Sequence, residues 1–162
     1  MQDTDKTTVR EFKVEDAEDL RKLADACQPL LVNGVYVNIF LAKYFGNSCF
    51  IMELEGKPIG FVSGFKSTTD PKIFFLWQLG LLPEFRGKGL STPLIHRVFE
   101  AAKKLNCEKA QFSISPTIDS SFHAFSNYAK KKDRTMKVVE ERKYSDPLSG
   151  KKGHEVFYEI EL

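Results

Sequence analysis

Two hydrophobic periods alternate along the chain, and each predicts a different kind of secondary structure. Alternating apolar residues, or short apolar runs bounded by turn residues, indicate strands. The segments of this kind are 7–13, 49–54, 59–65, 73–82, 110–114, 136–141 and 155–162. Apolar residues three and four positions apart indicate helices over 16–26, 34–45, 90–105 and 119–132, the last with Asp119 or Ser120 as its N-cap. A polar loop is predicted over 142–153.

The segment 73–82 differs from the other strands because it is apolar at nearly every position. Such a run is typical of a central strand that is covered on both faces. The alternation of strands and helices favours an α+β fold, an α/β/α sandwich in which a mixed sheet carries helices on both faces. We expect a single domain over residues 7–162, preceded by a flexible tail over residues 1–6.

Composition and charge narrow the functional classes. Lys and Arg total 24 and Asp and Glu total 22, so the formal net charge is +2, which is less basic than is usual for a nucleic-acid-binding domain. No segment is apolar over the length of a membrane span. Cys27, Cys49 and Cys107 follow no metal-binding spacing and fit a reducing compartment. We therefore expect a cytoplasmic protein with no metal, nucleic-acid or membrane partner.

The segment that joins the central strand to the next helix carries recognisable chemistry. Gly87 and Gly89 lack Cβ atoms, so the backbone there can approach an anion closely. The first turn of the following helix adds unpaired N–H groups and the positive end of the helix dipole. Arg86 and Lys88 add positive charge, and Ser91 adds a hydroxyl donor. The segment predicts a pyrophosphate-binding loop, although a surface turn with incidental basic residues is the alternative.

The order strand, Pro83, Arg86-Gly87-x-Gly89 and helix resembles the signature of the GNAT superfamily of acyl-CoA N-acyltransferases. The resemblance implies a mixed, mostly antiparallel sheet and an acetyl-CoA-dependent N-acetyltransferase. It also implies that the coenzyme A pyrophosphate binds Arg86, Gly87, Lys88, Gly89, Leu90 and Ser91. The pantetheine arm would pair with Leu79, Gly80 and Leu81, where a backbone N–H would polarise the thioester carbonyl.

Further segments resemble the diaminobutyrate acetyltransferases of ectoine synthesis, namely 33–45, 60–65, 75–78, 113–117 and 154–162. The Phe-x-Trp-Gln run at 75–78 is the most specific of them. This resemblance implies that the acceptor is a small diamino acid, 2,4-diaminobutyrate, whose amine attacks the thioester directly. It implies acceptor contacts from Asn33, Tyr36, Trp77 and His154. Glu155 would remove a proton from the amine, and water or Tyr128 would protonate the leaving thiolate.

Each of these side chains also has a purely structural interpretation. Trp77 suits a core position on a central strand, and Tyr128 suits a packed position on a helix. His154 and Glu155 suit the solvated end of a strand.

Four positions depart from the patterns of the two families. Leu31 stands where the diaminobutyrate enzymes have an acid, and Asn38 stands where they have a second aromatic residue near the start of the helix. Ile118 stands where the superfamily usually has an Asn, and Phe125 where many members have a Tyr. Two alternatives therefore stay open: an enzyme for another small amine or polyamine, and a coenzyme A-binding module without turnover. Enzymes of this type are often dimers, which makes a homodimer the candidate assembly.

Overall fold

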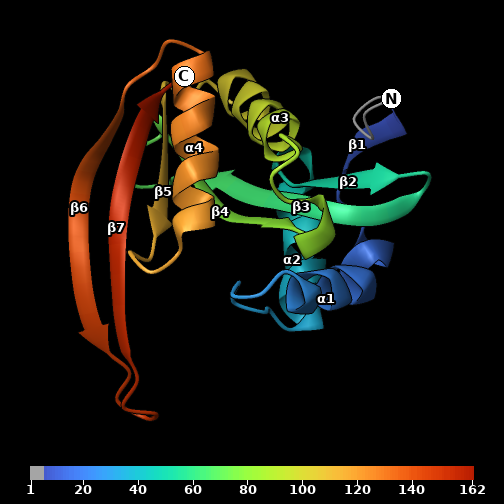
Figure 1. Cartoon of the computed structure of the whole chain (residues 1–162), viewed down its shortest axis with the longest axis horizontal. Coiled ribbons are helices and arrows are strands. Elements are labelled where there is room, and N and C mark those ends of the chain that lie inside the picture. The colour runs from blue at the N-terminus through green and yellow to red at the C-terminus, as the bar shows by residue number, and fades with distance from the viewer. Residues whose placement is uncertain (1–5) are drawn as a thin grey trace.

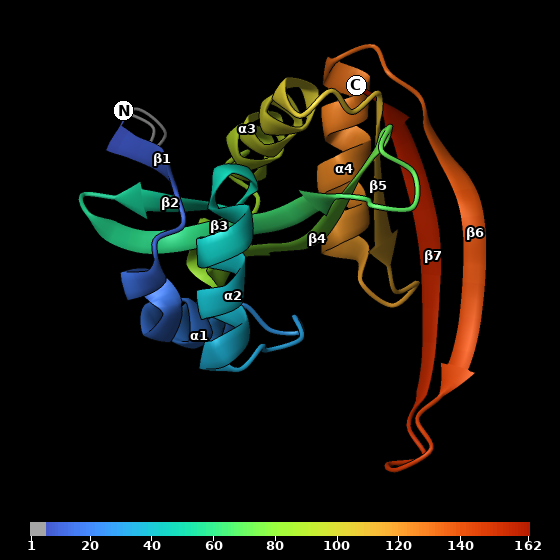
Figure 2. The same cartoon turned by 180° about the vertical axis from the view of Figure 1, so that it is seen from behind.

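The computed structural model describes residues 6–162, whose strands form one seven-stranded sheet (Figures 1 and 2). The strands are β1 (Thr7–Glu11), β2 (Phe50–Leu54), β3 (Lys57–Lys66), β4 (Ile73–Leu81), β5 (Lys109–Ile114), β6 (Met136–Ser145) and β7 (Lys152–Glu161). The α-helices are α1 (Ala17–Ala26), α2 (Val35–Phe45), α3 (Ser91–Lys104) and α4 (Asp119–Lys131). Short 3-10 helices follow β1, α2 and β4 at Val14–Asp16, Gly46–Ser48 and Pro83–Phe85.

The sheet has the strand order β1-β2-β3-β4-β5-β7-β6. Among the seven strands of residues 6–162, only the β4–β5 pair is parallel, and α3 forms the crossover between these two strands. The other neighbours are antiparallel. The predicted α+β architecture, with a mixed and mostly antiparallel sheet, is confirmed.

Two hydrophobic cores hold helices against opposite faces of the sheet. Phe50 and Met52 on β2 pack with α3 and α4, whereas Ile51 between them packs with α1 and α2. Successive side chains of a strand point to opposite faces, so β2 contributes to both cores. We call the two sides the α3/α4 face and the α1/α2 face; Figures 1 and 2 show the helix pairs on either side of the sheet.

The central strand β4 is covered differently from the prediction. Phe74 and Leu76 are buried in the core of the α3/α4 face, while Phe75 and Trp77 are only partly buried. Further along, Leu79 and Leu81 are partly exposed too. The expectation of complete cover on both faces is therefore wrong, because each helix pair covers only part of β4 and the apolar run includes side chains that line open surfaces.

The hairpin of β6 and β7 is longer than the sequence predicts. The sequence predicts a loop for residues 142–145, but these residues continue β6 and pair with 152–155 on β7. Nearly every side chain of β6 is exposed, so no apolar alternation marks the strand and its pairing with β7 defines it. The hairpin projects beyond the rest of the sheet in both views (Figures 1 and 2).

Two other expectations concern ends of elements. The N-cap of α4 is Ile118, without a side-chain cap, rather than Asp119 or Ser120. The predicted flexible tail falls on residues 1–6, of which 1–5 lie outside the described residues, while Lys6 forms an exposed ion pair with Glu55 at 3.3 Å. Within residues 6–162, no helix is long and apolar enough to cross a membrane.

Candidate active site

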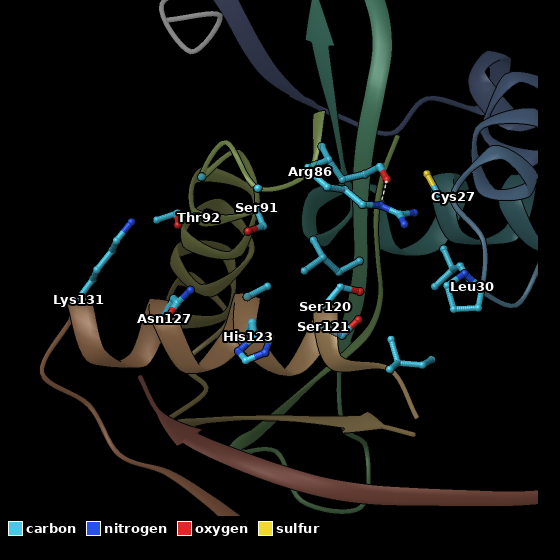
Figure 3. Close-up of a pocket in the computed structure, with 17 residues that line it drawn as sticks. Cys27, Leu30, Arg86, Ser91, Thr92, Ser120, Ser121, His123, Asn127 and Lys131 are labelled. Carbon is cyan, nitrogen blue, oxygen red and sulfur yellow. Dashed lines mark hydrogen bonds between the residues drawn. The ribbon is translucent and has the colours of Figure 1, made fainter. Parts of the chain in front are cut away.

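A cleft of about 360 Å³ opens on the α3/α4 face, between the end of β4, the start of α3 and one side of α4 (Figure 3). It exists because β4 and β5 pair only over Ile73–Phe75 with Lys109–Gln111 and then separate. Beyond Phe75, β4 keeps β3 as its neighbour, but no strand of the described residues pairs with it on the β5 side. An unpaired strand edge presents backbone donors and acceptors to whatever enters the gap.

The glycine loop forms one wall of the cleft. Gly87 has φ +73° and Gly89 has φ +77°, values that a residue with a Cβ atom rarely adopts. A Cβ built on either glycine would meet nothing within 4 Å, so the loop leaves open space beside its backbone. The helix α3 begins at Ser91 without a side-chain cap. The N–H of Thr92 donates to the carbonyl oxygen of Gly89 at 3.2 Å, and the other N–H groups of the first turn face no side-chain cap that would compete with an anion.

The Arg86 side chain closes one end of this cleft. Its Nε donates to the carbonyl oxygen of Leu81 at 2.9 Å (Figure 3). Its Nη2 donates to the carbonyl oxygen of Gln28 at 2.9 Å. The guanidinium therefore ties the end of β4 to the segment between α1 and α2. Because carbonyls carry no net charge, the positive charge of Arg86 stays uncompensated by these bonds and acts on the cleft.

Cys27 also lines the cleft, close to Arg86. Burial raises the pKa of its thiol to about 11, although the charge of Arg86 acts in the opposite direction. The thiol is therefore protonated near neutral pH and is a poor nucleophile. This chemistry agrees with acyl transfer that uses no covalent enzyme intermediate.

The structure brings six of the nine predicted coenzyme residues together in the cleft lining: Leu79, Leu81, Arg86, Gly87, Gly89 and Ser91. Gly80 faces the other way, since a Cβ there would meet the Phe61 ring at 2.5 Å. Lys88 places its Nζ over the Phe85 ring, 5.5 Å from the centroid, and Leu90 is buried in the core. Gly80, Lys88 and Leu90 therefore contribute backbone to this region rather than lining side chains.

The polar stripe that α4 presents to the cleft is not among the site residues predicted from the sequence. His123, Asn127 and Lys131 lie four residues apart and line its wall opposite the glycine loop (Figure 3). Ser120 and Ser121 continue the lining toward β4. The four-residue spacing of polar groups on a helix was the available signal, but the same spacing is typical of any solvated helix face.

The α1/α2 face of β4 carries a second group of polar and aromatic side chains. Ser63 pairs with Gln78 and Gly64 pairs with Leu76, so Trp77 is an extra residue in a β-bulge. Without the bulge, Gln78 would point toward the α3/α4 face like Leu76. With it, Trp77 packs against the α1/α2 core and Gln78 reaches the segment that precedes α2.

Two predicted acceptor residues lie in or beside that segment. Asn33 donates from Nδ2 to Oε1 of Gln78 at 2.8 Å. Tyr36, in the first turn of α2, is 78% exposed. Leu31 is also mostly exposed, at 73%, and only its backbone carbonyl is held, by Nε2 of Gln78 at 2.7 Å. The structure thus joins Asn33 to the β4 bulge and leaves Tyr36 at the surface.

The strand β7 places His154, a predicted acceptor contact, and Glu155, the predicted base, on opposite faces of the sheet. Phe157 lies 6.5 Å from Phe75, centroid to centroid, which places it on the α1/α2 face of the sheet. Glu155 shares that face because it lies two residues away, whereas His154 lies on the opposite face. His154 contacts Glu141 on β6 through its Nε2. The structure therefore brings Glu155, but not His154, to the side of the sheet that holds Trp77.

Tyr128 is buried between α4 and α3. Its hydroxyl lies 3.5 Å from Nδ1 of His96, and its ring meets Phe99 edge to face. Burial raises the pKa of the phenol, and Tyr128 does not line the cleft. Phe125, one turn earlier on α4, stacks on Phe112 with ring centroids 3.8 Å apart.

Residues 17–126 match the Acetyltransferase (GNAT) family. The match includes β4, the glycine loop and the first half of α4. The chain belongs to this family and is an acetyl-CoA-dependent N-acetyltransferase. Its co-substrate is accordingly acetyl-CoA, and the family resemblance expected from the glycine loop is confirmed.

The relatives include L-2,4-diaminobutyric acid acetyltransferases. The one from Halomonas elongata is 30% identical over 145 residues, which cover 88% of this chain and 74% of that protein. The one from Vibrio parahaemolyticus is 27% identical, over 72% of this chain and 64% of that protein. Diaminobutyrate acetyltransferase EctA from Paenibacillus lautus, solved with L-2,4-diaminobutyric acid and coenzyme A, has the same fold: the TM-score is 0.84 at 24% identity, over 96% of this chain and 94% of that one.

Proposed function

We propose that the chain transfers the acetyl group of acetyl-CoA to one amino group of 2,4-diaminobutyrate. The observation that carries the proposal is that β4 is open on opposite faces at neighbouring positions. Leu79 and Leu81 line the coenzyme cleft on one face, and Phe75 and Trp77 are partly exposed on the other. The two openings meet at the bulge, where β4 also parts from β5. The names of the diaminobutyrate relatives support this choice of acceptor.

In the proposed complex, acetyl-CoA lies in the cleft with its pyrophosphate at the loop 86–91. The pantetheine arm runs along the unpaired edge of β4 at 79–81 and brings the thioester to the bulge. A backbone N–H at this edge stabilises the oxyanion that develops on the thioester carbonyl. Holding the thioester and the amine on adjacent parts of one strand makes their reaction effectively unimolecular.

The proposed reaction is direct attack by the neutral amine. The nitrogen forms a bond to the carbonyl carbon, the C–S bond breaks, and coenzyme A leaves as a thiolate. Glu155 first accepts a proton from the substrate ammonium group and so supplies the neutral amine, because it lies on the face that holds Trp77. The nitrogen gives its second proton to water as the amide forms. Water in the cleft protonates the thiolate, since the Tyr128 hydroxyl is directed at His96 on α3.

Coenzyme A release from acetyl-CoA tests this proposal. A free-thiol assay compares 2,4-diaminobutyrate with ornithine, lysine, diaminopropane and spermidine. We expect the highest kcat/KM with 2,4-diaminobutyrate. A preference for an amine without a carboxylate would favour the polyamine alternative, and binding of acetyl-CoA without turnover of any amine would favour the binding module.

Replacement of Trp77 tests the acceptor side separately from the coenzyme side. Its ring is on the α1/α2 face, 6.3 Å from Phe65, and could meet an ammonium group face-on. We expect Trp77→Ala to raise KM for the amine about tenfold, which corresponds to about 1.4 kcal/mol. KM for acetyl-CoA is expected to stay within about twofold, as measured by steady-state kinetics. Trp77→Phe retains an aromatic face and should behave almost like the wild type; equal changes in both KM values would contradict this assignment.

We also propose that the chain is a homodimer that associates through α2. Tyr36, Phe40 and Tyr44 recur every four residues and are 78%, 41% and 62% exposed, so one side of the helix is an aromatic stripe. Phe40 and Tyr44 already contact each other, with centroids 5.4 Å apart. A continuous exposed stripe of large aromatic side chains is typical of protein interfaces.

Sedimentation velocity checks the assembly. We expect the wild type to sediment as a dimer and the double variant Tyr36→Lys, Phe40→Lys to sediment as a folded monomer. Leu148→Lys is the control, because Leu148 is an exposed apolar residue of the β6–β7 turn outside the stripe. A wild-type monomer, or a dimer that survives the double substitution, would contradict the proposal.

The buried and unpaired state of Cys27, Cys49 and Cys107 supports a reducing compartment, which we propose to be the cytoplasm.

A further inference from the structure

A buried glutamine controls the orientation of the predicted acceptor residue Asn33. Gln78 is 5% exposed and uses both ends of its amide. Its Nε2 donates to the carbonyl oxygen of Leu31, and its Oε1 accepts from Nδ2 of Asn33. The Leu31 carbonyl can only accept, which fixes the Gln78 amide with Nε2 toward it and Oε1 toward Asn33. The Asn33 amide is thereby fixed as well, with its NH₂ group turned to Gln78.

The other polar atom of the Asn33 amide is its oxygen, Oδ1. Within residues 6–162, no protein group donates a hydrogen bond to Asn33 Oδ1. Asn33 is only partly buried, so this oxygen can meet a ligand. An amide oxygen accepts hydrogen bonds and cannot donate them, so it suits an ammonium group and not a carboxylate.

The side chain of Leu31 cannot hold an ammonium group of the substrate. The side chain that replaces the expected acid is turned to solvent, and it offers no charge to a substrate. A bound ammonium group can instead be held by Asn33 Oδ1, on the same face of the sheet as Trp77. A neutral oxygen stabilises the ammonium form less than a carboxylate does.

We propose that Gln78 is a positioning residue that aims Asn33 Oδ1 at the ammonium group of the substrate that does not react. The inference rests on the proposed function, because it needs a substrate with two amino groups. Gln78 acts through Asn33 and does not itself touch the substrate. The bulge at Trp77 is what directs Gln78 toward Asn33 instead of the α3/α4 core.

Two substrates separate this role from a general loss of structure. 2,4-Diaminobutyrate carries a second ammonium group, and 4-aminobutyrate lacks it but keeps the carboxylate and an amine. We expect Gln78→Met and Asn33→Ala each to raise KM for 2,4-diaminobutyrate about tenfold, the loss expected for a hydrogen bond to a charged group. KM for 4-aminobutyrate and for acetyl-CoA should stay within about twofold of the wild type. The double variant should be no worse than either single variant, because both remove the same contact.

The matched control is Gln111→Met. Gln111 is a glutamine on the neighbouring strand β5, where its Nε2 donates to Glu159 at 2.9 Å. We expect this variant to keep the wild-type ratio of the two KM values.

Three results would overturn the inference. An equal rise in KM for both amines in Gln78→Met would mean that Gln78 only supports the fold, and additive effects in the double variant would mean that the two residues act independently. Both results leave the proposed function intact. A wild-type enzyme that acetylates neither compound would contradict the proposed function and overturn the inference with it.

Discussion

The substitution Gly89→Ala is expected to raise KM for acetyl-CoA about a hundredfold. Gly89 has φ +77° and lines the coenzyme cleft. A Cβ at this position would meet no protein atom within 4 Å. It would instead occupy part of the cleft that we assign to the pyrophosphate. The methyl group would keep the anion away from the backbone N–H groups. The expected hundredfold rise in KM corresponds to a loss of about 2.7 kcal/mol of binding free energy. Steady-state kinetics with acetyl-CoA as the varied substrate measures the effect.

Gly150→Ala is a matched control for the backbone strain. Gly150 has φ +69°, and a Cβ there would also meet nothing within 4 Å, but it lies in the turn between β6 and β7. Both substitutions should lower the free energy of unfolding by roughly 1–2 kcal/mol, because each forces a Cβ into the left-handed region. Only Gly89→Ala should change KM for acetyl-CoA. Similar kinetics in the two variants would remove the loop from the binding site.

Glu155→Gln is expected to lower kcat at neutral pH about a hundredfold, with little change in KM for acetyl-CoA. A general base typically contributes a hundredfold or more, and glutamine removes the base while it preserves the shape. Free alkyl amines have a pKa of about 10, so they deprotonate without help as the pH approaches that value. The difference between the variant and the wild type should therefore shrink as the pH rises. A pH series of kcat from neutral to alkaline values measures it.

The control for this prediction is Glu161→Gln. Glu161 lies on the same strand and, six residues away, on the same face as Glu155, but it is exposed at the far end of β7. It should keep the wild-type pH profile. A deficit in Glu155→Gln that stays constant at every pH would identify a binding or structural role for this carboxylate.

Most of the fold followed from local patterns, and the exceptions have physical causes. The helices α1, α3 and α4 each carry an apolar stripe of helical period, whereas α2 is apolar around most of its circumference. The predicted ranges of all four helices lie within about two residues of the observed ones. The end of β6 could not be predicted, because residues 142–145 are exposed and belong to a strand only through their pairing with β7. Pairing between distant segments leaves no local signal when neither face of the strand is buried.

The two halves of the site differed in how far the sequence could describe them. The glycine loop was predictable, because positive φ values and close approach to an anion both require glycine. The bulge at Trp77 was not, since the apolar run 73–82 looks the same with or without an extra residue. Without the bulge, neither the direction of Gln78 nor its bond to Asn33 can be inferred. The sequence likewise predicts both His154 and Glu155 on the acceptor side. Adjacent residues of a strand face opposite ways, and the sequence alone does not show which of the two faces Trp77.

The most direct test of the account is to identify the product formed from acetyl-CoA and 2,4-diaminobutyrate. Mass spectrometry of the reaction mixture, combined with a thiol assay, compares the acetylated amine with the coenzyme A released. We predict one monoacetylated diaminobutyrate for each coenzyme A, and no coenzyme A release when the amine is omitted. Coenzyme A release that is independent of the amine, or acetyl-CoA that binds and persists unchanged beside diaminobutyrate, would contradict the account.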